Sequence, residues 1–73
     1  MSVSVSYADV LRMLENCAKG YNIRRTTHGR RVEFNGRVYL DLPKHDQIEI
    51  GHLRKMVRHL GIDKDCARKF GCY

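Results

Sequence analysis

The sequence predicts one small α+β domain in the order helix, three antiparallel strands, helix, with both long helices on one face of the sheet. Residues 7–18 and 53–60 repeat apolar side chains at the spacing of one helix face. The segment between them alternates apolar and polar residues around an Asn-Gly pair, which is typical of a β-hairpin. A chain of 73 residues buries enough surface for a single core, so the second face of the sheet is expected to be open.

The first element is an amphipathic helix over about residues 7–18. Ser6 precedes it as a candidate N-cap, and Gly20 follows where a left-handed residue can end a helix. The apolar face comprises Tyr7, Val10, Leu11, Leu14, Cys17 and Ala18. These side chains are expected to pack against the sheet.

Three strands are expected between the two long helices. The first covers about residues 21–26 and leads into a turn at residues 27–29. The next two cover residues 30–34 and 37–42 and flank Asn35-Gly36.

The register of this hairpin follows from which side chains would share a face. A two-residue Asn35-Gly36 loop would mix apolar and charged side chains on both faces. A three-residue loop with Gly36 left-handed in a bulge pairs Val32 with Val38 and gathers the apolar side chains on one face. The sequence therefore predicts the bulged hairpin. Its open face would carry Arg31, Glu33, Arg37, Tyr39 and Asp41, and Tyr39 would pair across strands or stack on a base, with pairing favoured.

The second half of the chain contains a connection and two further helices. Pro43 ends the third strand, and residues 44–50 form a connection with Ile48 and Ile50 directed inward. The second long helix presents Leu53, Met56, Val57 and Leu60 as its apolar stripe. Gly61 is expected to end it, and Asp63 to cap a last short helix that carries Ala67 and Phe70 and stops at Gly71.

The chain is basic, with 14 Lys and Arg against eight Asp and Glu and a formal charge of +6. Each half carries +3, so the charge belongs to the folded body and would attract polyanions such as RNA. The alternative is that the charge only maintains solubility. The sequence shows neither a signal peptide nor an apolar run of about 18 residues, so the chain is expected to be soluble and cytoplasmic, with no membrane partner.

Three cysteines leave one unpaired in any intramolecular scheme, which favours a reducing compartment. Cys17 is expected to pack on a helix face, and Cys66 and Cys72 are expected to be inert. His45, His52, His59 and Cys66 recur every seven residues, but only His52 and His59 are expected to share a helix, and two turns, about 10 Å, separate them. No metal site and no cofactor are therefore predicted.

Arg24, Arg25, Arg30 and Arg31 surround His28 at the predicted turn between the first two strands. Guanidinium groups bind phosphate oxygens and can stabilise charge that develops on phosphorus. RNA supplies its own nucleophile, the 2′-hydroxyl, so its cleavage needs only a base and cations. Histidine is suited to be that base, because free imidazole titrates near neutral pH. The alternative is an ordinary solvated basic turn.

Three runs in the second half stand out together with the lone His28. They are Leu42-Pro43-Lys44-His45, Gly51-His52-Leu53-Arg54 and Gly61-Ile62. With these residues the chain resembles the HicA family of small bacterial toxins. The family pattern at the same spacings is apolar-Pro-x-His, Gly-Thr-Leu-Arg and Gly-Leu. The resemblance implies a fold like the double-stranded-RNA-binding domain (dsRBD-like), messenger-RNA cleavage through one histidine, and a HicB-like antitoxin partner. It covers Ser6 to Ile62 within a single domain of residues 1–73, and residues 63–73 form a C-terminal extension.

In the family the catalytic histidine follows a Gly-Ser pair, and Thr26-Thr27-His28 stands at that place here. Thr27 supplies a hydroxyl, but Thr26 replaces the glycine with a β-branched residue that resists left-handed backbone geometry. Gly29 could restore flexibility from the other side. The resemblance implies that His28 is catalytic. The residues expected to bind RNA are Arg24, Arg25, Thr27, Arg30, Arg31, Lys44, His45, Arg54 and Lys55.

Two other functions fit the same residues. The first is a non-catalytic RNA-binding module in which Thr26 has removed the chemistry. The second is a basic domain that binds an acidic protein.

Overall fold

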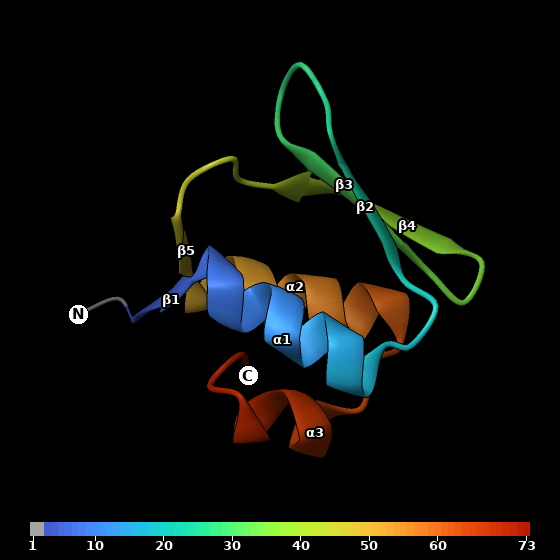
Figure 1. Ribbon diagram of the computed structural model, residues 1–73, viewed down its shortest axis with the longest axis vertical. Coiled ribbons are helices and arrows are strands. Elements are labelled where there is room, and N and C mark those ends of the chain that lie inside the picture. The colour runs from blue at the N-terminus through green and yellow to red at the C-terminus, as the bar shows by residue number, and fades with distance from the viewer. Residues whose placement is uncertain (1–2) are drawn as a thin grey trace.

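A computed structural model describes residues 3–73 (Figure 1). In chain order the elements are β1 (Ser4–Ser6), α1 (Tyr7–Cys17), β2 (Asn22–Arg25), β3 (Arg30–Phe34), β4 (Arg37–Leu42), β5 (Gln47–Glu49), α2 (Ile50–Leu60) and α3 (Lys64–Lys69). Strands β2, β3 and β4 form an antiparallel sheet in that order. The predicted α+β class and three-stranded sheet are confirmed.

Helices α1 and α2 lie on the same side of the sheet, and α3 lies beyond them, away from the sheet (Figure 1). The core fills the space between the sheet and the helices. Its fully buried members include Val32 and Leu42 from the sheet, Leu14 from α1 and Leu53 from α2. No helix among residues 3–73 has the length and apolar character needed to cross a membrane.

Helix α1 forms as its sequence predicts. The Ser6 hydroxyl accepts a hydrogen bond from the Asp9 N–H at 3.2 Å and so caps the first turn. Gly20 follows the helix with a φ of 88°, a left-handed geometry that suits glycine. Met13, which lay outside the predicted apolar face, is also fully buried, so the buried face of α1 is wider than predicted.

Helices α2 and α3 also match expectation. Leu53, Met56, Val57 and Leu60, the predicted stripe of α2, are fully buried. Gly61 ends α2 in the left-handed conformation, with φ 71° and ψ 28°. The Asp63 side chain accepts hydrogen bonds from two backbone N–H groups and caps α3, which confirms the short last helix.

The β3–β4 hairpin does not have the predicted register. Phe34 pairs with Arg37 across a two-residue loop, and Val32 pairs with Tyr39 rather than Val38. Asn35 and Gly36 both have positive φ, 55° and 77°, as the tight hairpin turn for an Asn-Gly pair requires. The three-residue loop was therefore the wrong prediction.

A bulge in the middle of β4 explains how the tight loop is accommodated. Val32 pairs with Tyr39, and Arg30 pairs with Leu42. One residue of β3 therefore stands opposite two residues of β4, and the extra residue of β4 forms the bulge. Tyr39 and Leu42 therefore both face the helices, and Leu40 between them is 58% exposed. The prediction that Tyr39 lies on the open face is wrong, because its side chain is only 8% exposed within the core.

Strands β1 and β5 form a second, two-stranded antiparallel ribbon that the sequence did not predict. Val5 pairs with Ile48, and the Tyr7 N–H donates to the Asp46 carbonyl at 2.7 Å. Because β1 leads directly into α1 and β5 into α2, the ribbon holds the beginnings of the two helices together. Ile48 is fully buried as expected, whereas Ile50 is half-buried at the start of α2.

Cys17 and Cys66 form a disulfide that joins the end of α1 to α3. The two residues were expected to be separate, a packing cysteine and an inert one, so this prediction is corrected. The sequence did not predict that the end of α1 and α3 lie close together, because Cys17 and Cys66 are 49 residues apart. Cys72 is a free thiol and is fully buried.

Arg30 was expected to bind phosphate, but it is only 6% exposed. Its guanidinium donates to the carbonyls of Pro43 (2.8 Å), Lys44 (3.0 Å) and His45 (3.1 Å). The guanidinium carbon also lies 3.6 Å from the centre of the Tyr7 ring, a cation–π contact. Arg30 is thus a structural residue that binds the β4–β5 connection to the sheet and to α1.

We expect Arg30→Ala to lower the free energy of unfolding by about 3 kcal/mol, because three partly buried carbonyls would lose their donor and a cavity would form. Urea denaturation followed by circular dichroism measures the change. Arg12→Ala, at an exposed arginine of α1, should cost less than about 0.5 kcal/mol. Equal effects of the two changes would contradict a structural role for Arg30.

We expect replacement of both disulfide cysteines, Cys17→Ala with Cys66→Ala, to reduce stability by about 2–4 kcal/mol, since the bond closes a loop of 49 residues. The measurement is again urea denaturation. Titration of the denatured, unreduced protein with a thiol reagent should find one free thiol per chain, that of Cys72. Three free thiols would show that the bond does not form.

Candidate nucleic-acid interface

The turn that carries His28, residues 26–29, projects from the body of the molecule between β2 and β3 (Figure 1). Thr27 and His28 are exposed at its tip. Thr26 closes the turn, because its N–H donates to the Gly29 carbonyl at 2.7 Å and its hydroxyl contacts both the carbonyl and the N–H of Gly29. The imidazole is therefore presented to solvent on a backbone that Thr26 holds in shape.

Gly29 is needed for close approach rather than for a left-handed backbone. Its φ is not among the positive values that four other glycines adopt. A Cβ at this position would lie 2.8 Å from the Leu42 carbonyl oxygen, which is backbone and cannot move aside. The expected role of Gly29 in restoring left-handed flexibility is thus replaced by a packing role, which sets the turn against the end of β4.

Lys44 holds the other side of the turn. Its ammonium donates to the Thr27 carbonyl at 2.8 Å, and its own carbonyl accepts from Arg30. Lys44 therefore links the two, since Arg30 fixes its backbone and its side chain reaches the His28 turn. A positive charge lies directly beside the residue that precedes His28.

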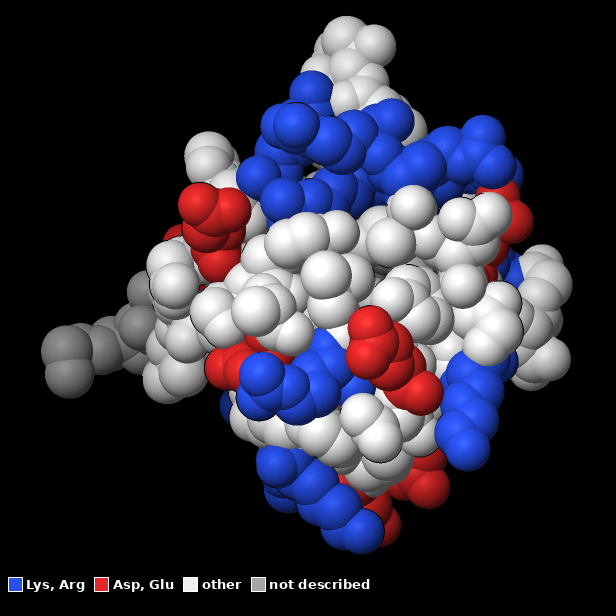
Figure 2. Space-filling model, viewed as in Figure 1, with Lys and Arg blue, Asp and Glu red and all other residues white. Residues whose placement is uncertain are grey.

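Three more cations belong to the same end of the sheet. Arg24 and Arg25 are exposed on β2. Arg24 pairs with Arg31 on the open face, and Arg25 pairs with Arg30, so strand alternation places Arg25 on the other face of the sheet. Arg31 also forms an ion pair with Glu33, so its charge is partly offset. Figure 2 shows Lys and Arg side chains gathered in a band over this end of the molecule, below the white tip of the turn. We call Arg24, Arg25, Arg31, Lys44 and His28 the turn cluster.

Of the other predicted RNA-binding residues, Thr27 lies within the turn and His45 follows Lys44, whereas Arg54 and Lys55 lie apart from the turn cluster on α2. His45 has an exposed side chain in the β4–β5 connection, and its carbonyl is bound by Arg30. Arg54 and Lys55 are exposed on α2, in the helical layer. Arg30 faces inward and contributes no donor to the surface.

A shallow hollow on the open face of the sheet, beside the β3–β4 loop, was not predicted. It is lined by Gly20, Asn22, Arg31, Glu33, Phe34, Asn35, Gly36, Arg37 and Val38. Asn22 could not be recognised as part of it from the sequence, because its place depends on the pairing of Asn22 with Glu33. The hollow lies next to Arg31 and adds polar surface to the turn cluster.

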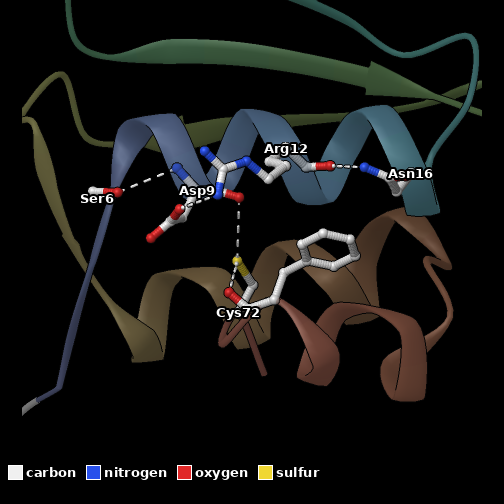
Figure 3. Close-up of polar contacts among 6 residues, drawn as sticks. Ser6, Asp9, Arg12, Asn16 and Cys72 are labelled. Atoms are coloured by element: carbon white, nitrogen blue, oxygen red, sulfur yellow. Dashed lines mark hydrogen bonds and ion pairs between the residues drawn. The ribbon is translucent and has the colours of Figure 1, made fainter.

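The other reactive groups have structural roles. The Cys72 sulfur lies beneath α1, 4.0 Å from the Asp9 carbonyl oxygen (Figure 3). Burial, with a smaller contribution from the Asp9 charge, raises the pKa of this thiol to about 11, so it stays protonated at neutral pH. His59 lies on α2 with its Nε2 2.7 Å from the Val38 carbonyl oxygen, which ties α2 to the edge of β4. Among residues 3–73, no group of His, Cys, Asp or Glu side chains could hold a metal ion.

Comparisons of the chain with protein-family models, with curated proteins and with solved structures find no match. The likeness to HicA toxins therefore remains an expectation based on the motif residues. What the site can do follows from its own geometry, namely an exposed imidazole on a turn that Lys44 contacts, at the end of the sheet that also carries Arg24, Arg25 and Arg31.

We expect Gly29→Ala to move the turn, because its new methyl group would meet the Leu42 carbonyl. The cost should be about 1–3 kcal/mol in unfolding free energy. The amide signals of residues 26–29 in an NMR spectrum should shift more than those of α1. Gly51→Ala, where a Cβ meets nothing within 4 Å, is the matched control and should leave these signals in place.

Proposed function

We propose that this chain is a metal-independent messenger-RNA endoribonuclease of the HicA type, the toxin of a toxin–antitoxin pair, with the turn cluster as its active site. The observation that carries the proposal is the exposure of His28 on a turn whose neighbours Arg24, Arg25 and Lys44 are cationic. This arrangement offers a base and phosphate-binding groups at the same end of the sheet, which are the groups that RNA cleavage requires.

In the proposed reaction His28 accepts the proton of a ribose 2′-hydroxyl. The 2′-oxygen attacks the adjacent phosphorus, and the bond from phosphorus to the 5′-oxygen of the next nucleotide breaks. A 2′,3′-cyclic phosphate forms, and solvent protonates the departing 5′-oxygen. Negative charge grows on the phosphoryl oxygens during this step, so the nearby guanidinium groups stabilise the transition state more than the bound substrate.

The remaining residues position the reacting groups or extend the contact with RNA. Lys44 acts partly as a positioning residue, because its ammonium holds the Thr27 carbonyl. Thr27, His45, Arg54 and Lys55 are proposed to contact RNA outside the reacting nucleotide. Arg30 acts only through the β4–β5 connection that it binds.

The proposal also covers the fold family, the protein partner and the cellular compartment. We propose that the sheet with α1 and α2 on one face is a dsRBD-like arrangement, and that a HicB-like antitoxin covers the turn cluster. Messenger RNA as substrate implies a cytoplasmic site of action. The Cys17–Cys66 disulfide weighs against this compartment, since such bonds are rare where thiols are kept reduced.

A non-catalytic RNA-binding module is the second candidate, and two observations favour it. Thr26 occupies the place of the family glycine and closes the turn through its hydroxyl. Within residues 3–73 none of the side-chain hydrogen bonds holds the His28 ring, so no neighbouring group orients it as a base.

The two candidates differ in whether RNA is cut. We expect purified protein to cleave single-stranded RNA in the presence of a chelator, and His28→Ala to slow cleavage by about 10²–10⁴-fold, the usual contribution of general acid–base catalysis. Gel analysis of an end-labelled RNA measures the rate. The new ends should be a cyclic phosphate and a 5′-hydroxyl.

His52→Ala is the matched control, since this histidine lies on α2 and has no proposed role. Its cleavage rate should equal that of the unchanged protein. RNA binding without cleavage would establish the second candidate in place of the first. If the protein neither binds nor cleaves RNA, both candidates are rejected and a basic protein-interaction domain is the remaining function.

A further inference from the structure

A second cationic cluster surrounds Tyr73, on the α2–α3 side of the molecule. The Nε–H of Arg58 donates to the Tyr73 hydroxyl at 3.1 Å. The Arg58 guanidinium, the Lys64 ammonium and the Arg68 guanidinium lie 5.9, 5.9 and 5.7 Å from the centre of the Tyr73 ring. We call these residues, together with Arg54, the Tyr73 cluster.

The charge of this region is high for its size. Residues 52–73 contain six Lys and Arg but only two acidic residues, so they carry +4 of the total formal charge of +6. Of the two acids, Asp63 uses its carboxylate to cap α3, and Asp65 pairs with Arg68 at 2.7 Å. None of the ion pairs within residues 3–73 involves Arg54, Arg58 or Lys64.

The electrostatic potential at the Tyr73 ring reflects this excess of positive charge. The hydrogen bond from Arg58, followed by the charges of Arg58, Lys64 and Arg54, lowers the pKa of the Tyr73 hydroxyl from its ordinary value, although desolvation acts in the opposite direction. Three cations from two helices therefore act on one aromatic group. Concentrating like charges in this way is unfavourable unless an anion offsets it.

The Tyr73 cluster is separate from the turn cluster. The turn projects beyond the sheet, and α3 lies on the opposite side of the helical layer (Figure 1). Lys64, Arg68 and Tyr73 also lie outside the segment that resembles the HicA toxins, and Arg54 is the one member already proposed to contact RNA outside the reacting nucleotide. The cluster is therefore not part of the proposed cleavage site.

Single-stranded RNA fits the combination of an aromatic ring with dispersed cations. A base that is free to unstack can lie on the tyrosine ring, while the phosphates on either side meet the arginines and the lysine. A duplex would satisfy the cations but would keep its bases away from the ring. An acidic peptide would also satisfy the cations, but its carboxylates would not make use of the ring.

We propose that Tyr73 with Arg54, Arg58, Lys64 and Arg68 forms a second contact site for single-stranded RNA. The inference rests on the proposed function in naming RNA as the ligand, but it requires no cleavage. The site would hold a part of the strand away from the turn cluster. It would increase affinity without taking part in the reaction.

Binding is measured with a fluorescently labelled 2′-O-methyl RNA oligonucleotide, which lacks the nucleophilic hydroxyl and cannot be cut by the proposed reaction. We expect Tyr73→Leu to weaken binding about tenfold and Tyr73→Phe to keep it within about twofold, because phenylalanine retains the stacking face. Arg58→Gln with Arg68→Gln should also weaken binding about tenfold. The same pair should reduce the slope of log affinity against log salt by about 1.4, as the loss of two phosphate contacts predicts.

The matched control is Arg12→Gln with Lys19→Gln, which removes the same charge from exposed positions on α1. It should change affinity less than twofold. Circular dichroism melting of each variant excludes unfolding as the cause of weaker binding.

Equal weakening by the control pair would overturn the proposal, because net charge alone would then explain binding. Unchanged affinity of Tyr73→Leu would overturn it as well. If a hexaglutamate peptide bound the cluster more tightly than the oligonucleotide, the surface would be a protein contact instead. Cleavage is measured separately, with ordinary RNA, on the unchanged protein and on the His28→Ala variant. Absence of cleavage in that assay would reject the proposed reaction but would not affect this binding test.

Discussion

The guanidinium of Arg30 is the constraint on which the proposed active site depends. A buried charge is costly unless its donors are satisfied, and here three successive carbonyls and an aromatic ring satisfy them in place of a carboxylate. The β4–β5 connection must therefore follow the planar fork of the arginine. That path places Lys44 where its ammonium reaches the Thr27 carbonyl, so the inward arginine indirectly fixes the outward turn.

Arginines that look equivalent in the sequence have different roles because strand alternation separates them. Arg30 and Arg31 are neighbours on β3, so one side chain faces the core and the other the open face. Arg24 shares the open face with Arg31, since the two pair across the strands. Burial of Arg30 removes one phosphate-binding group from the predicted set but gives the remaining ones a rigid support.

Local signals in the sequence predicted the helices, their caps and the existence of the hairpin, because these depend on residues within a few positions of one another. Ser6, Gly61 and Asp63 act as predicted. The register of β4 was missed because alternation was assumed to continue unbroken, whereas the bulge resets it between Tyr39 and Leu42. The β1–β5 ribbon and the Cys17–Cys66 disulfide were missed because they join distant segments. For the site, exposure of His28 could be predicted from its turn, but the support from Lys44 and Gly29 could not.

The turn cluster and the Tyr73 cluster are held in place by different restraints. Arg30, Lys44 and the close contact of Gly29 with Leu42 hold the turn against the sheet. Helix α3 is attached to α1 through Cys66 and to the core through Ala67, and Cys72, just after the helix, is also fully buried. Because no residue belongs to both sets, loss of the disulfide would loosen the support of Tyr73 while the restraints on His28 persist. RNA binding at the Tyr73 cluster and RNA cleavage at the turn cluster, as proposed, are therefore separable in this fold.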